Sequence, residues 1–239
     1  MSIRRLSEID LAKFAALSGD MLERALRAYN TGGGSWSYNP VRHSTADILA
    51  AQTPLLGSIE AASWSSLERQ IARACTRGEA QRVANVEVGQ TLFEASRRYG
   101  WKAAKFDMGR LPIGFGESVS YWSDVVVEDE TGLFVPFFDH RRARGIANQS
   151  VRQIVHSMQH LWIRERYPDL VDARLAVVRF PSGRERRGIQ VDFHRDVELL
   201  SYEDLDARVR NVYQVWAQVS DERDRKKRSG TDGSNPFGF

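Results

Sequence analysis

The hydrophobic pattern changes its period at Gly100, and this change restricts the chain to folds that combine helices with a sheet. Before Gly100, apolar residues recur at the spacing of one helix face, as in the stripe of Val88, Leu92, Ala95 and Tyr99. Beyond Gly100, apolar and polar residues alternate, which is typical of strands with one buried face. A glycine placed after such a stripe also favours the end of a helix. The sequence therefore predicts a helix that runs directly into a sheet.

Three alternating segments follow, at 105–113, 117–128 and 133–141. The last two are separated by Asp129-Glu130-Thr131-Gly132, in which the glycine suits the left-handed backbone of a hairpin turn. We therefore expect residues 125–129 and 133–138 to pair in an antiparallel hairpin around Glu130 and Thr131. Together the three segments predict an antiparallel meander.

The rest of the chain completes an α/β pattern. Helical periodicity is present before the meander at 65–76 and 79–99, and it returns after it at 147–166 and 202–219. Short apolar strands are expected at 173–180 and 188–194. The fold class is thus α/β, with a core of helix, three-strand antiparallel meander, helix and strand, and with extra helices at both ends.

Three regions are expected along the chain. Residues 1–64 form an amino-terminal helical region that contains the glycine-rich loop Thr31–Pro40. Residues 65–220 form the α/β core. Residues 221–239 lack apolar periodicity and carry a basic run, so we expect a disordered basic tail.

Composition narrows the class of protein further. With 239 residues, 42% hydrophobic and 27% charged, the chain resembles an ordinary globular protein. No apolar run reaches the roughly 18 residues of a membrane span, and Met1–Asp10 lacks the apolar centre of a secretory signal, so we expect no membrane partner and a cytoplasmic protein. Cys75 is the single cysteine, which excludes intrachain disulfides and cysteine-built metal clusters. The oligomeric state is left open.

Two aspartates in apolar surroundings are the main candidates for chemistry. Asp124 lies within the segment YWSDVVVED, and Asp139 ends LFVPFFD, so each carboxylate needs a partner or a cation. A hairpin with a two- or a four-residue loop places Asp124 opposite Phe137 or opposite Asp139, and either register puts both aspartates on one face together with Arg141. Two converging carboxylates suit Mg²⁺ or Mn²⁺.

At these residues the chain resembles the restriction-endonuclease-like, PD-(D/E)XK, nuclease superfamily. The resemblance spans roughly residues 80 to 180 and includes the order of helix, three-strand meander, helix and strand. It implies Asp124 and Asp139 as the motif acids, a metal-dependent hydrolase that cleaves phosphodiesters, and DNA or other nucleic acid as the substrate. Arg141 takes the position of the family's lysine, which is a departure because arginine does not give up its proton at working pH.

Further site residues follow from this resemblance. Lys105, near the first strand of the meander, would substitute for the motif lysine. Gln153 or Gln159 on the following helix would match the family's glutamine. Glu87 and Glu94, which lie seven residues apart on one helix face, would supply a further metal-binding carboxylate.

Three other interpretations stay open at this point. In the first, Asp124 and Asp139 are ordinary structural residues paired with arginines. In the second, the chain is a non-catalytic member of the same fold that binds nucleic acid or a protein. In the third, a protein partner is bound through the carboxyl-terminal Phe237 and Phe239. A third carboxylate or Lys105 converging on both aspartates would favour the enzyme, and saturation of both aspartates by arginine would favour the binding protein.

Overall fold

The structure is a computed structural model, and it describes residues 6–29, 37–53, 60–112, 118–120, 124–141, 145–146, 148–183, 186–195 and 198–231. Within these residues the chain forms eight α-helices, two short helical turns of other types and seven strands. In chain order the elements are α1 (Glu8–Ala15), α2 (Gly19–Ala28), α3 (Asn39–His43), α4 (Thr45–Ile48), α5 (Trp64–Ala74), α6 (Glu79–Arg98), β1 (Lys102–Lys105), β2 (Arg110–Pro112), β3 (Ser118–Ser120), β4 (Val125–Asp129), β5 (Gly132–Asp139), α7 (Gln149–Gln159), η1 (His160–Arg164), η2 (Pro168–Leu170), β6 (Arg174–Arg179), β7 (Gln190–Phe193) and α8 (Tyr202–Thr231).

A five-stranded mixed sheet forms the centre of the molecule, in the order β1-β4-β5-β6-β7. Strand β6 runs parallel to β5, while the other neighbouring pairs are antiparallel. The parallel step requires a crossover, which α7 provides between β5 and β6. Strands β2 and β3 pair with each other in a separate two-stranded sheet. Strands β1, β4 and β5 form an antiparallel meander, but its first strand lies at Lys102–Lys105 rather than at the expected 105–113. Parts of the first two expected segments instead form the β2-β3 ribbon, which is inserted between β1 and β4.

The hairpin between β4 and β5 is confirmed. Asp129 pairs with Gly132 and Val127 with Phe134, so the loop contains two residues. Gly132 has a φ of 117°, a value that side chains with a Cβ rarely adopt. The Asp129 carboxylate accepts hydrogen bonds from the backbone N–H of Thr131 at 2.8 Å and from its hydroxyl at 2.7 Å, which stabilises the turn.

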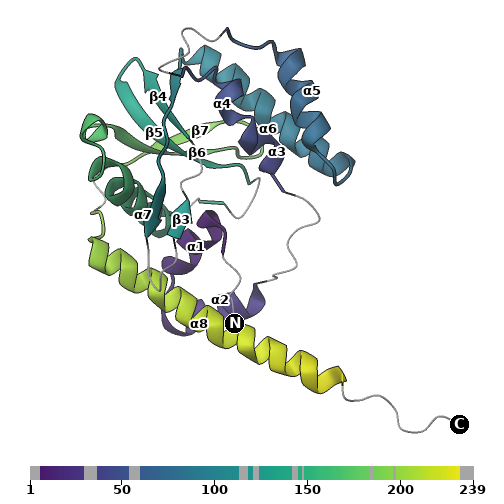
Figure 1. The fold of residues 1–239 in the computed structure, drawn as a ribbon, viewed down its shortest axis with the longest axis vertical. Helices are drawn as coiled ribbons and strands as arrows, with labels where there is room; N and C mark the ends of the chain where they lie inside the picture. Colours follow the sequence, from purple (N-terminus) through teal and green to yellow (C-terminus); the bar gives the residue numbers. More distant parts are fainter. Residues whose placement is uncertain are drawn as a thin grey trace, which may run out of the picture.

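Helices cover both faces of this sheet (Figure 1). On one face, side chains of α1, α2, α7 and α8 form an apolar cluster with the sheet residues Val126, Val135, Phe137 and Val177. On the other face, side chains of α3 to α6 form a second cluster with Val125, Val127, Phe134 and Val178. The alternation along β4 and β5 expected from the sequence thus separates two cores. Helices from residues 1–64 contribute to both clusters, so apolar contacts continue across the expected boundary at residue 64.

Helix α8 continues past the point where a disordered tail was expected. Its last turns extend beyond the rest of the ribbon, and residues 221–231 are helical (Figure 1). The Arg223 side chain donates to the carbonyls of Leu26, Arg27 and Tyr29 at 3.2, 2.8 and 2.9 Å, where the last carbonyls of α2 have no helical partner. Glu222 accepts two hydrogen bonds from Arg27. These long-range contacts order a segment whose own sequence has no apolar face to bury.

The fold class is therefore a mixed α/β protein, while the restriction-endonuclease-like assignment remains a prediction. None of the helices that the structure describes is long and apolar enough to cross a membrane. Cys75 is a half-buried free thiol. Residues 31–36 of the glycine-rich loop and the aromatic residues Phe237 and Phe239 lie outside the described residues.

Candidate functional site

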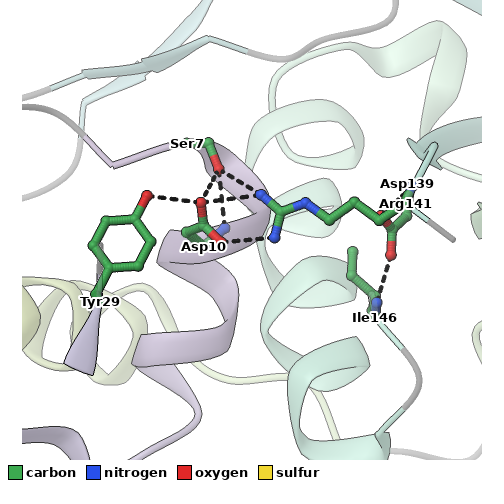
Figure 2. A network of polar contacts seen from close by, with 6 residues as sticks. All are labelled: Ser7, Asp10, Tyr29, Asp139, Arg141 and Ile146. Carbon is green, nitrogen blue, oxygen red and sulfur yellow. Dashed lines mark hydrogen bonds and ion pairs between the residues drawn. The ribbon is translucent and has the colours of Figure 1, made fainter. Parts of the chain in front are cut away.

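The candidate site lies at the end of β5, where Asp139, His140 and Arg141 leave the sheet and meet the start of α1. Figure 2 shows six residues of this site, which we call the Arg141 cluster: Ser7, Asp10, Tyr29, Asp139, Arg141 and Ile146. They come from segments up to 139 positions apart in the sequence, as between Ser7 and Ile146. Only the tertiary fold brings them together.

Arg141 binds the Asp10 carboxylate with both ends of its guanidinium group. Its Nη1 lies 2.7 Å from Asp10 Oδ1, and its Nη2 lies 3.0 Å from Oδ2 and 3.3 Å from the Ser7 hydroxyl (Figure 2). Tyr29 donates a further hydrogen bond to Asp10 Oδ2 at 3.0 Å. Burial opposes the ionisation of Asp10, but the hydrogen bonds and charge of Arg141 outweigh it and lower the pKa of Asp10. Such a bidentate pair holds a strand end to a distant helix.

The Asp139 carboxylate is engaged by backbone amides. Asp139 is 1% exposed, and its two oxygens accept hydrogen bonds from the N–H of Arg141 at 3.2 Å and of Ile146 at 2.5 Å (Figure 2). A buried carboxylate is stable when such donors replace its lost water. Asp139 therefore anchors the segment that leaves β5.

Asp124 has different surroundings. It precedes β4, its side chain is exposed, and its carbonyl accepts the N–H of Phe106. Partial burial raises the pKa of its carboxyl, the charge of Asp107 adds to this rise, and that of Lys105 opposes it. Asp124 lies outside the observed pairing of β4 with β5, which joins residues 127–129 to residues 132–134. Lys105 is the basic residue whose charge acts on Asp124.

Three other predicted site residues, Gln153, Glu87 and Glu94, each contact a different part of the chain. Gln153 on α7 donates to the Glu198 carbonyl at 2.8 Å. Glu87 on α6 accepts from the Arg187 N–H at 3.0 Å, and Glu94 pairs with Arg186 at 2.7 Å. The structure therefore brings each of these side chains to a partner other than Asp124 and Asp139.

Gln159, the alternative to Gln153, has a structural position. It is fully buried, and its Nε2 donates to the carbonyls of Val135 at 2.9 Å and Ala176 at 3.1 Å. Pro136, opposite Ala176 in the sheet, has no amide proton to donate. The Gln159 side chain thus connects the neighbouring strands β5 and β6.

Sequence reasoning missed several residues around His140. His140 is buried, and its ring stacks on Phe180 with centroids 5.5 Å apart. Burial lowers the pKa of His140 to about 3, with the charges of Arg42 and Arg187 adding to the effect. Arg187 is 4% exposed and donates to the His140 carbonyl at 2.8 Å and to the Tyr38 hydroxyl at 2.5 Å. No local signal marks these partners, because they come from three distant segments.

A second buried acid lies in the same region. Burial raises the pKa of Glu8, on the first turn of α1, to about 7, although the positive charges of Arg42 and Arg141 oppose the rise. Burial also lowers the pKa of Arg42 to about 9. Two acidic side chains of α1 thus lie among arginines from other segments at the end of the sheet, and Asp10 is the one that forms an ion pair, with Arg141.

The geometry of the site favours a structural role. Asp10 and Asp139 already have donors, and among the residues that the structure describes no three His, Cys, Asp or Glu side chains gather so that they could hold a metal ion. Neither of the two patterns set out above is present in full. The charge of Lys105 acts on Asp124, and Asp139 is held by the backbone N–H groups of Arg141 and Ile146 rather than by an arginine side chain. The Mg²⁺ or Mn²⁺ site stays a prediction that no observation tests.

Comparison with known proteins gives a consistent family. A family model described as sliding clamp-binding bacterial toxin SocB matches residues 9–226. The chain is 34% identical over 236 residues to the DNA replication inhibitor toxin SocB of Caulobacter vibrioides (strain NA1000 / CB15N), and the alignment covers 98% of each protein. No solved structure matches.

These matches contradict the resemblance to PD-(D/E)XK nucleases. That resemblance depended on short acidic motifs and element order, whereas the match to the toxins extends over nearly the whole chain. The expected metal-dependent nuclease, a hydrolase of phosphodiesters, is therefore wrong, and the match gives magnesium no support. The protein-binding alternative agrees better with the comparisons.

Proposed function

The chain belongs to the SocB family of sliding clamp-binding bacterial toxins, and from this premise we propose that it binds the bacterial sliding clamp and thereby inhibits DNA replication. The observation that carries the proposal is the extent of the match, which covers 98% of both chains at 34% identity. A match of this extent includes both apolar clusters and the Arg141 cluster. The partner is then a protein, and binding to nucleic acid remains a prediction from the sequence.

The proposal assigns clamp recognition to residues within 9–226, the part that the family model matches. Phe237 and Phe239, proposed from the sequence as a docking segment, lie beyond that part. Near the same point, the side chains of Glu222 and Arg223 contact the end of α2. We therefore expect the surface of the folded region, rather than the final aromatics, to contact the clamp.

Binding to purified clamp tests the proposal directly. The full chain should bind immobilised sliding clamp of its own bacterium in a saturable manner, and its expression should reduce incorporation of labelled thymidine into DNA. A stable interface of ordinary size buries about 1,200–2,000 Å², so binding should protect a defined set of amides from hydrogen exchange. No saturable binding by the folded chain would contradict the proposal.

A truncation separates the two candidate surfaces. A chain that ends at Thr231 keeps α8 and removes Phe237 and Phe239. Its affinity for the clamp should equal that of the full chain within about twofold, because the removed residues lie outside the family match. Loss of binding on truncation would assign recognition to the carboxyl-terminal aromatics instead.

Since replication takes place on the bacterial chromosome, the proposal also implies the cytoplasmic location expected from the sequence.

A further inference from the structure

A cleft of about 400 Å³ lies between the first turns of α7 and the edge strand β7. Its lining includes Arg152 and His156 from α7, Asp192 from β7, and His194 and Arg195 directly after that strand. None of these residues belongs to the Arg141 cluster. A volume of this size lies within the range of small-ligand sites.

The charges that line the cleft favour an anion. Arg152 and Arg195 contribute two positive charges, and Asp192 contributes a negative charge that is already engaged. Asp192 Oδ2 accepts from Arg179 Nε at 2.6 Å, and its Oδ1 accepts from the Gln190 amide at 3.0 Å. Arginine is well suited to oxyanions because its planar group presents several donors.

The hydrogen bonds of His156 determine which of its nitrogens carries the proton. Gln159 Nε2 donates to two sheet carbonyls, which leaves Gln159 Oε1 as an acceptor. His156 Nδ1 lies 3.0 Å from this oxygen and must therefore be the donor. Burial lowers the pKa of His156 to about 4, so the ring is neutral at pH 7 and its Nε2 is an acceptor.

The imidazole of His156 thus sets a second requirement for any ligand of the cleft. His156 is 3% exposed, lines the cleft and packs against His194 with ring centroids 5.3 Å apart. Its Nε2 makes no hydrogen bond with any of the residues that the structure describes. A ligand that contacts this nitrogen must donate a hydrogen bond, while the arginines require the same ligand to be negatively charged.

We propose that this cleft binds a phosphate group that carries a proton. Hydrogen phosphate has oxygens for Arg152 and Arg195 and an O–H for His156 Nε2, and it fulfils both requirements at neutral pH. Sulfate has the same shape and charge but no proton, so one of its oxygens would face the lone pair of His156. This inference does not depend on binding to the sliding clamp.

Titration of the full chain with three anions at about pH 8 tests the proposal. Inorganic phosphate keeps a proton at this pH, sulfate has none, and glycerol phosphate has lost its proton because its second pKa is about 6. Calorimetry should show saturable binding of inorganic phosphate and about tenfold weaker binding of the other two anions, corresponding to one unfavourable contact. In ¹⁵N spectra of the imidazoles, the signals of His156 and His194 should shift when phosphate is added. In the protein without phosphate, the same spectra should show the His156 proton on Nδ1.

Two variants assign the binding to this cleft. Arg195→Gln removes an exposed charge and should weaken phosphate binding about tenfold, while Arg186→Gln, a matched change at an exposed arginine on another loop, should leave it unchanged. His156→Leu should make phosphate and sulfate bind equally. Equal affinities for the two anions in the unaltered protein, a proton on His156 Nε2, or equal effects of the Arg195 and Arg186 variants would each overturn the proposal, even if His156→Leu does not fold.

Discussion

At the scale of single residues, Gly145 lies so close to the Asp139 carboxylate that there is no room for a side chain. A Cβ at Gly145 would overlap Asp139 Oδ2, the atom that accepts the Ile146 N–H. The Gly145→Ala variant should therefore displace this segment and lose a buried hydrogen bond, which costs about 1–3 kcal/mol. Urea unfolding measures the change in the free energy of unfolding.

Gly188→Ala is the matched control for this prediction. A Cβ at Gly188 would meet nothing within 4 Å. We expect its free energy of unfolding to remain within about 0.5 kcal/mol of the unaltered protein. If Gly145→Ala were equally neutral, the assignment of Asp139 as the anchor of this segment would be wrong.

The Arg141 side chain provides a second test at this scale. Arg141→Lys keeps the positive charge but cannot contact both oxygens of Asp10 and the Ser7 hydroxyl in the geometry of a guanidinium group. We expect a loss of about 1–2 kcal/mol in the free energy of unfolding. Arg210→Lys changes a more exposed arginine, which pairs with Asp206 on α8, and should cost less than about 0.5 kcal/mol. Equal losses in the two variants would argue against a special role of the bidentate pair.

At the scale of elements, α8 shows how distant contacts extend a helix. Arg223 donates to three carbonyls at the end of α2 and lies over the Trp216 ring, with its guanidinium carbon 5.4 Å from the ring centroid. Arg223→Ala should therefore release the last turns of α8. Hydrogen exchange of the amides in residues 221–226 should become at least about tenfold faster, because local opening needs less free energy.

The control for α8 is Arg225→Ala, which removes an exposed arginine from the same turns. Exchange in residues 221–226 should then stay close to that of the unaltered protein. Fast exchange throughout this segment before any substitution would instead support the disordered tail expected from the sequence.

At the scale of the whole molecule, three buried titratable groups contribute to the dependence of stability on pH. Burial lowers the pKa of His156 from 6.5 to about 4 and that of His140 from 6.5 to about 3. Between the folded and unfolded values, the unfolded chain binds protons that the folded chain does not, so both histidines make stability rise with pH up to about 6.5. Burial raises the pKa of Glu8 from 4.5 to about 7, which has the opposite effect between these values.

The Glu8→Gln variant isolates the opposing contribution. Between about pH 4.5 and 7 the folded chain holds a proton on Glu8 that the unfolded chain has lost, so Glu8 makes stability fall as pH rises. Without this carboxyl, stability should rise more steeply with pH, by about 1.4 kcal/mol per pH unit within this window. Urea unfolding at a series of pH values measures both curves, and Glu130→Gln at the exposed hairpin turn should reproduce the unaltered curve. Parallel curves for Glu8→Gln and the unaltered protein would contradict a buried, protonated Glu8.

The sequence alone determined those parts of the fold that depend on short-range patterns. Alternation along 125–138 and the glycine at 132 specify the β4-β5 hairpin, because side-chain direction and backbone φ are local properties. Helical stripes likewise indicated α5, α6 and the start of α8. The same alternation predicted that Asp124 and Asp139 share one face, but Asp124 precedes β4, so this placement stays a prediction.

Only the tertiary structure decided what those side chains contact. Asp139 meets backbone amides and Arg141 meets Asp10, which lies 131 positions away, and neither partner is marked by any local pattern. The same holds for α8, whose last turns depend on carbonyls of α2 almost 200 positions away. The physical reason is that a charged side chain shows in the sequence that it needs a partner when buried, but the partner is selected by how the elements pack.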